Sequence, residues 1–96
     1  MTSKQRSNLK SIAATLKPIA QVGKEVVSDN LLKGLSDALE AHELIKINLL
    51  PASGEDEDAL AAGIASALKA EVVIVIGRRA VLYRRSSREG FDHIKF

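Results

Sequence analysis

Residues 71–76, Glu-Val-Val-Ile-Val-Ile, are the part of this sequence that most restricts the fold. After Glu71 every side chain is β-branched, which favours an extended backbone, and the unbroken apolar run 72–76 is typical of a strand covered on both faces. Gly77 opens a short turn, and residues 80–84 follow as a second apolar segment. We therefore predict a central strand at 71–76 that forms an antiparallel hairpin with 80–84.

Three segments before this hairpin show the apolar spacing of amphipathic helices. The first starts near Ser3, its expected cap, and has its apolar stripe within 9–16; Pro18 ends it because proline disfavours helical geometry in the preceding residue. Ser28 is a good cap for the second helix, which runs to about His42. The third helix follows an acidic run, and its expected inner face consists of Leu60, Ile64, Ala67 and Leu68.

Two predicted strands separate these helices. Residues 19–22 form a short apolar segment that Gly23 closes, and residues 44–50 alternate between apolar and polar side chains. The alternation places Lys46 and Asn48 on the same face of their strand, away from the isoleucines beside them. That face is therefore expected to be solvated.

The resulting order, α-β-α-β-α-β-β, predicts an α/β fold with a mixed four-stranded sheet. Each β-α-β crossover favours parallel pairing, whereas the closing hairpin is antiparallel. Three helices suffice to cover one face, which leaves the other face wet and gives a two-layer sandwich. The 96 residues are too few for two cores, so we predict a single domain over 1–96, with a core of about 4–85 and a tail at 86–96 whose conformation stays open.

The composition excludes several classes of protein. The chain has no cysteine, which rules out a disulfide scaffold, a zinc ribbon, an iron–sulfur site and a thiol nucleophile. The N-terminus carries no apolar segment of the secretory kind, and the longest apolar stretch, residues 59–65, is far shorter than the roughly 18 residues that span a bilayer. We expect a cytoplasmic protein that does not act at a membrane.

The net charge of +2 conceals a segregation of charge along the chain. Residues 1–24 hold five basic residues and no acid, a net +5, and residues 76–96 hold six basic residues against two acids, a net +4. Residues 25–75 hold ten acids against three lysines, a net −7. A fold that joins the two ends would create a basic face suited to a polyanion, although charge blocks alone are equally compatible with ordinary solvated surface.

Neither a catalytic set nor a cofactor motif is evident in the sequence. His42 lies near Glu40 and Glu43, but neighbouring helix residues point in different directions, and a histidine there suits the end of a helix dipole. Gly23 and Gly77 lack the further glycines of phosphate-binding loops. We expect no enzymatic activity, no cofactor, no metal and no small-molecule substrate.

Nucleic acid is the polyanion that the remaining features favour. The chain has only three aromatic residues, too few for a platform on which bases stack, so recognition would rest on phosphates. The loop 23–26 precedes a helix N-terminus, where free amides favour an anion. The hairpin carries Arg78 and Arg79 at its turn and Arg84 at its end, although an arginine-rich hairpin can also be a soluble sheet edge.

Several motifs occur together in the order of a known family. They are Lys4-Gln5, Leu9-Lys10, Leu16-Lys17-Pro18-Ile19, Val22-Gly23-Lys24, the segment ALEAHELIK at 38–46, Ile76-Gly77 and Val81-Leu82-Tyr83-Arg84. Over about residues 4–85 the chain resembles the CRM domain (chloroplast RNA splicing and ribosome maturation), in particular its stand-alone bacterial form, the YhbY-like proteins. The resemblance implies an RNA-binding module with a fold similar to the C-terminal domain of bacterial translation initiation factor three. It also implies association with precursors of the large ribosomal subunit (pre-50S), and in plants the same domain recurs in group II intron splicing factors.

The family has a G-x-x-G loop similar to the backbone clamp of KH domains. Here the loop is Gly23-Lys24-Glu25-Val26, so valine replaces the second glycine. Valine is costly at positive φ and blocks close backbone approach, and Glu25 places a negative charge where a phosphate would lie. Only Gly23 and Lys24 carry the family's role over to this chain.

These observations lead to one hypothesis and one alternative. The hypothesis is a non-enzymatic protein that binds ribosomal RNA during assembly of the large subunit. Its expected RNA-binding residues are Arg6, Lys10, Lys17, Gly23, Lys24, Arg78, Arg79 and Arg84. The alternative is a protein-interaction module that contacts a basic ribosomal protein through its acidic middle segment, notably the run 55–58, although acids in the first turn of a helix also complement its positive end.

Overall fold

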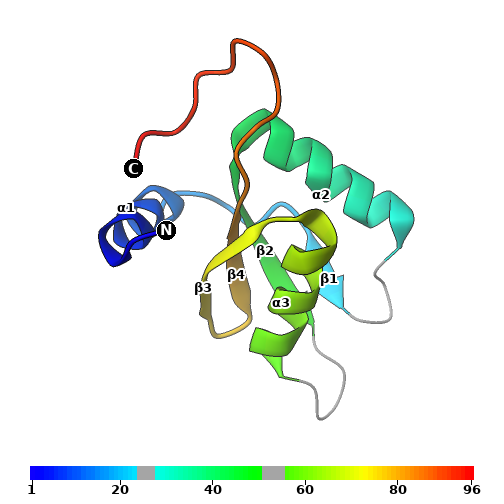
Figure 1. Ribbon diagram of the computed structural model, residues 1–96. Helices are drawn as coiled ribbons and strands as arrows, with labels where there is room; N and C mark the ends of the chain where they lie inside the picture. Colours follow the sequence, from blue (N-terminus) through cyan, green and yellow to red (C-terminus); the bar gives the residue numbers. More distant parts are fainter. Residues whose placement is uncertain (24–27, 51–55) are drawn as a thin grey trace.

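The computed structural model describes residues 1–23, 28–50 and 56–96, and within them three helices and four strands follow the predicted order (Figure 1). The elements are α1 (Ser3–Ala13), β1 (Gln21–Gly23), α2 (Asp29–His42), β2 (Leu44–Leu50), α3 (Glu57–Leu68), β3 (Glu71–Ile76) and β4 (Arg79–Tyr83). The α/β class and the order α-β-α-β-α-β-β are thereby confirmed. None of the helices in these residues is long and apolar enough to cross a membrane.

The four strands form one mixed sheet in the order β1-β2-β4-β3. β1 pairs with β2 in parallel, with Val22 opposite Leu49, whereas β4 is antiparallel to both of its neighbours. Gly77, at φ +57°, is the first central residue of the two-residue hairpin loop, a position that favours glycine. The predicted mixed sheet and hairpin are therefore confirmed.

β3 lies at an edge of the sheet, so the prediction of a central strand at 71–76 is wrong. Its β-branched side chains are nevertheless packed on both sides. Val72 and Val75 contact one apolar core, and Val73 and Ile74 contact a second core on the opposite face. Burial on two faces, rather than pairing with two strands, accounts for the apolar run.

The first core fills the space between the sheet and the helix pair α2 and α3. Alternate residues of β2 point into it, as the sequence pattern predicted. Its buried members are Val22, Leu35, Leu39, Ile45, Ile47, Leu49, Leu60, Ala61, Ile64, Ala65, Leu68, Ala80 and Leu82. The sheet and the helix pair α2 and α3 thus form two layers, but α1 does not belong to this helical layer as the predicted two-layer sandwich required.

The second core lies on the opposite face of the sheet, where α1 packs (Figure 1). Our expectation that all three helices would cover one face and leave the other wet is therefore wrong. Leu9 and Ala13 of α1 need an apolar surface, and Leu44, Val73 and Val81 supply one on this face. Leu16, Ile94 and Phe96 complete the covering, and the half-buried Ile74 and Tyr83 of the sheet pack against the same core.

Capping residues fix where each helix begins. Thr2, not the expected Ser3, caps α1, and its hydroxyl and the Gln5 side chain form a reciprocal capping box. Ser28 caps α2 as predicted. Asp56 caps α3 by accepting from the Asp58 amide, so the described acids of the 55–58 run serve as a helix start; residue 55 lies outside the described residues.

The C-terminal segment, residues 86–96, contains neither helix nor strand and is held against the domain by a buried carboxylate. Glu43 caps α2 in the left-handed conformation and is fully buried. It accepts hydrogen bonds from the Ser86 amide at 2.7 Å, the Ile94 amide at 2.7 Å and His93 Nδ1 at 2.5 Å. Burial by itself raises the pKa of this carboxyl, but these hydrogen bonds outweigh it and hold the pKa below the ordinary value.

A second carboxylate and an aromatic pair complete this attachment. Glu40 accepts from the hydroxyls of Ser86 and Ser87 and from the Ser87 amide. The hydrogen bonds from Ser87, followed by that from Ser86, lower the pKa of Glu40 to about 2. At the end of the segment, the ring of Phe96 meets Tyr83 edge-on, with 4.9 Å between ring centroids. The tail is therefore docked, an arrangement that the sequence pattern left open.

Candidate nucleic-acid interface

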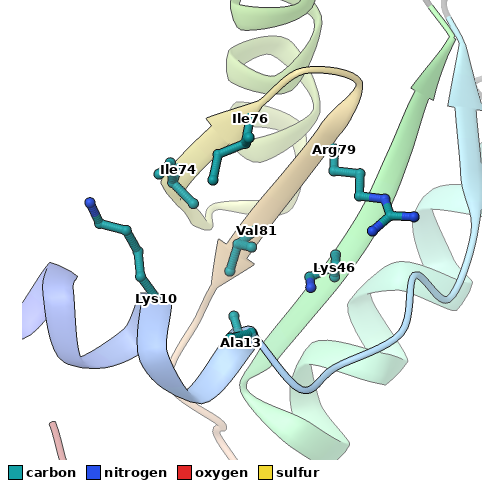
Figure 2. A pocket seen from close by; sticks show the side chains of 8 residues that line it. Lys10, Ala13, Lys46, Ile74, Ile76, Arg79 and Val81 are labelled. Carbon is teal, nitrogen blue, oxygen red and sulfur yellow. The ribbon is translucent and has the colours of Figure 1, made fainter.

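The second face of the sheet is only partly covered, and a groove lies where α1 stops covering it. The groove has a volume of about 230 Å³. Figure 2 shows the apolar side chains of its floor between Lys10 on α1 and the pair Lys46 and Arg79 on β2 and β4. Its lining residues are Lys10, Ala13, Ala14, Lys46, Ile74, Ile76, Arg79 and Val81. The two basic ends of the sequence thus meet on one face.

Strand register explains why these side chains converge. Lys46 pairs with Val81, which pairs with Ile74, so one row of side chains runs across three strands on this face. Arg79 and Ile76 form the next row towards the hairpin turn. Directly opposed residues have Cβ atoms about 5 Å apart. The groove floor is therefore part of the regular sheet, not a loop.

A second cavity of about 340 Å³ adjoins the groove and shares Lys46 with it. Lys17 lies at its rim, and His42 at the end of α2 also contributes. Its other lining residues are Ile12, Leu16, Ile19, Leu44, Ile45 and Ile94. Among the residues that the structure describes, no Asp or Glu lines either cavity. Positive charge here is thus not neutralised by carboxylates in the lining.

Arg6, one of the residues expected to bind RNA, makes contacts within the protein instead of facing the groove. Its Nη1 donates to the carbonyl oxygens of Val72 at 2.6 Å and Val73 at 2.8 Å. These carbonyls lie where the register between β3 and β4 shifts. Arg6 therefore ties α1 to the edge strand.

Arg84 is also engaged internally, and on the side of α2 and α3. Its guanidinium donates to the carbonyls of Leu68 at 2.8 Å and Ser36 at 2.9 Å, and to the Ser36 hydroxyl at 3.0 Å. Glu40 lies 3.7 Å from the same group. Arg84 thus joins the two helices to the end of β4, and both of its terminal nitrogens already donate within the protein.

The other expected residues are placed differently. Lys10, Lys17, Arg78 and Arg79 are exposed. Gly23 is the buried last residue of β1, and its partner Leu50 brings it to the end of the sheet where Arg78 and the hairpin turn lie. Lys24, together with the rest of the loop at 24–27, lies outside the described residues.

Lys46 is the one basic residue among those described in the groove lining that we did not expect to bind RNA. The alternation in β2 correctly predicts that Lys46 lies on the second face of the sheet. We expected that face, however, to be ordinary solvated surface. Pairing of β2 with β4 brings Lys46 beside Val81 and one row from Arg79. The signal in the sequence that could have identified Lys46 was a basic residue at a polar position of an alternating strand.

The described residues of this face offer basic side chains beside an apolar floor. Within 1–23, 28–50 and 56–96, no three side chains of His, Cys, Asp or Glu are grouped so that they could hold a metal ion. His93 is bonded to the buried Glu43. Lysine and arginine beside an apolar floor suit phosphate groups and an apolar moiety attached to them.

Comparison with known proteins agrees with this geometry. Residues 1–84 match the CRS1/YhbY (CRM) domain. The chain is 42% identical over 86 residues to the probable RNA-binding protein YqeI of Bacillus subtilis, with 90% of each chain covered. It is 33% identical over 88 residues to the probable RNA-binding protein PA4753 of Pseudomonas aeruginosa, covering 92% of this chain and 85% of that one.

A solved structure supports the same comparison in three dimensions. The solution structure of the hypothetical protein SAV1595 from Staphylococcus aureus, itself proposed to bind RNA, superimposes with a TM-score of 0.74. The two chains are 36% identical, and 93% of each is covered. The sequence comparisons and the structural comparison therefore agree on the group of proteins that this chain resembles.

Proposed function

This chain belongs to the CRS1/YhbY (CRM) domain family, and from that premise we propose that it is a non-enzymatic RNA-binding protein of large-subunit ribosome assembly. The proposed RNA-binding domain spans residues 1–96, with a core of about 4–85. Its proposed target is ribosomal RNA in precursors of the large subunit, and its place of action is the cytoplasm. We base the target on the resemblance to the YhbY-like proteins. Every sequence motif that carries this resemblance lies within residues 1–84, which match the family.

The observation that carries the proposal is the gathering of cations on the partly covered face. Lys10, Lys46 and Arg79 surround one groove, and Lys17 lies at the rim of the adjoining cavity. Phosphate oxygens are acceptors that such donors bind irrespective of sequence. Arg78 extends the charged surface to the hairpin turn. We leave Arg6 and Arg84 out of the proposed contacts, because their guanidinium groups hold backbone carbonyls.

The alternative, a protein-interaction module that uses the acidic segment, has less support. Asp56 accepts from an amide at the start of α3, and Glu57 and Asp58 occupy its first turn. These charges therefore have a role in the helix itself. A partner protein is not needed to explain them.

Salt dependence of binding to fragments of large-subunit ribosomal RNA tests the RNA-binding proposal. Each neutralised phosphate contributes about 0.9 to the slope of log K against log salt on duplex, as calibrated on B-DNA. Lys46→Ala is expected to reduce that slope by about 1. Lys33→Ala, an exposed lysine on α2, is the matched control and should leave it unchanged. A slope near zero for the unmodified protein would reject phosphate binding.

The target is tested separately in cell extracts. The protein is expected to sediment with precursors of the large subunit, and nuclease treatment should release it. Nuclease-resistant association would favour protein contacts instead. Crosslinking followed by mapping of the bound RNA positions would identify the element, and crosslinks spread evenly over unrelated RNA would contradict a ribosomal role.

The contribution of the loop 23–26 needs its own variant. Glu25→Lys is expected to tighten binding if a phosphate lies beside this loop, because it replaces a repulsive charge with an attractive one. Unchanged affinity would show that RNA does not approach the loop.

A further inference from the structure

The groove between α1 and the hairpin has more apolar surface than phosphate binding requires. Ile76 is 66% exposed although it belongs to a regular strand, and Ile74 and Val81 continue the same surface inwards. We propose that this groove receives one unpaired nucleotide of RNA, with the base against the apolar floor and the adjoining phosphates at Lys10, Lys46 and Arg79. This inference rests on the proposed RNA-binding function and specifies the form of RNA that the site takes.

Charge and polarity together select the occupant. A duplex presents phosphates and sugars, and its bases stay stacked inside, so the isoleucine floor would gain nothing from it. An unpaired base offers apolar faces, and proteins that take bases out of a stack hold them between aromatic or apolar side chains. An uncharged protein segment would instead desolvate three cations without neutralising them. An unstacked nucleotide satisfies both parts of the groove at once.

The dimensions fit a single small group. The volume of about 230 Å³ lies below the roughly 300–1,000 Å³ of pockets that enclose drug-sized ligands. The floor spans two rows of side chains, Val81 with Ile74 and Arg79 with Ile76. Among the described lining residues every side-chain polar group is a donor, so the N–H groups that the phosphates leave over can meet the two carbonyl oxygens of a uracil base. Uridine is therefore the probe of choice.

The test uses three RNAs that differ at one position: a perfect duplex, the same duplex with one bulged uridine, and the same duplex with an abasic nucleotide at the bulge. The abasic form keeps the phosphates and the bulge but removes the base. We expect the full chain to bind the uridine bulge about fivefold more tightly than the abasic bulge, at the low end of the range for bases stacked on side chains.

Variants of the protein locate the effect. Ile76→Ala should abolish the preference for uridine over the abasic site while leaving affinity for the perfect duplex unchanged. Because Ile76 is mostly exposed, the fold should be retained, which circular dichroism would verify. Leu50→Ala is the matched control, since Leu50 is an exposed strand residue outside the groove, and it should keep the preference. Lys46→Ala should weaken binding of all three RNAs by a similar factor.

The outcomes separate this inference from the proposed function. Equal affinity for uridine and abasic bulges, with salt-dependent binding intact, would overturn the nucleotide site and leave RNA binding standing. A uridine preference that survives Ile76→Ala would place the base elsewhere and would equally overturn it. Absence of binding to ribosomal RNA fragments as well as to all three probes would reject the proposed function itself.

Discussion

The two faces of the sheet are covered to different extents. On one face, α2 and α3 enclose an aliphatic core to which β1, β2 and β4 all contribute fully buried residues. On the other, α1 and the C-terminal segment cover a smaller core and leave the groove with Lys10, Lys46 and Arg79 open. The difference indicates that folding stability is concentrated on the closed face, whereas the partly open face keeps charged and apolar groups available for binding.

The strongest test of this contrast compares two fully buried leucines. Leu39→Ala in α2 is expected to lower the free energy of unfolding by about 4 kcal/mol, and Leu9→Ala in α1 by about 3 kcal/mol. The cavity left by Leu39→Ala would be enclosed by two helices and the sheet. Helix α1 is packed on one side only, so it can move into the cavity left by Leu9→Ala. Urea unfolding of both variants measures the difference. An equal or larger loss for Leu9→Ala would contradict the contrast.

The attachment of the C-terminal segment should respond next most strongly. Glu43→Gln keeps the size of the side chain but removes the charge and one of the acceptor oxygens that now serve His93 and two amides. We expect a loss of about 2 kcal/mol in the free energy of unfolding at neutral pH. Asp37→Asn, at an exposed acid of the same helix, is the control and should change stability by much less. Similar losses in the free energy of unfolding for both variants would show that the buried carboxylate contributes little to holding the C-terminal segment.

A smaller effect is expected from the aromatic pair that ends this segment. Phe96→Ala removes the edge-to-face contact with Tyr83 and should cost about 1 kcal/mol. Tyr83 is the single tyrosine, so its fluorescence reports the loss directly. Phe91→Ala, in the same segment but outside the second core, is the comparison and should leave the Tyr83 signal unchanged. Fluorescence unaffected by Phe96→Ala would contradict the contact.

The smallest predicted change is a local response to acid. The pKa of Glu40 lies at about 2 against an ordinary value of 4.5, and that of Glu43 is also lowered. Carboxyls with lowered pKa values stabilise the folded form above about pH 4.5, and this contribution is lost as the pH falls towards 2. The Tyr83 environment should therefore change over this range while helical circular dichroism persists. A Tyr83 signal that stays constant down to pH 2 would rule out this form of attachment.

Local patterns were sufficient to predict most of the elements. The apolar spacing correctly predicted that α2 ends at His42, and the alternation correctly predicted the bounds of β2. Gly77 correctly indicated the position of the hairpin turn. These features depend on neighbours in sequence. The side of the sheet that α1 covers depends instead on Leu44 and Val81, whose strands pair only in the folded chain. For the same reason the edge position of β3 was missed.

The candidate site was less accessible to sequence reasoning. Charge segregation correctly indicated a shared basic face, and Lys10 and Arg79 lie on it. The charge of a residue does not reveal its partner, however, so Arg6 and Arg84 were assigned to RNA although they hold carbonyls 66 and 48 positions away. Lys46 was overlooked because its neighbours come from β4 and from α1.

Arg6 has a further consequence for how molecules of this protein meet one another. An edge strand rich in β-branched residues can recruit a strand from a second chain through its unpaired backbone groups. The guanidinium of Arg6 already occupies the carbonyls of Val72 and Val73 on this strand. A strand arriving there would have to displace a charged group anchored on α1. The contact from the N-terminal helix thus leaves fewer free backbone acceptors on β3 for a strand of a second chain.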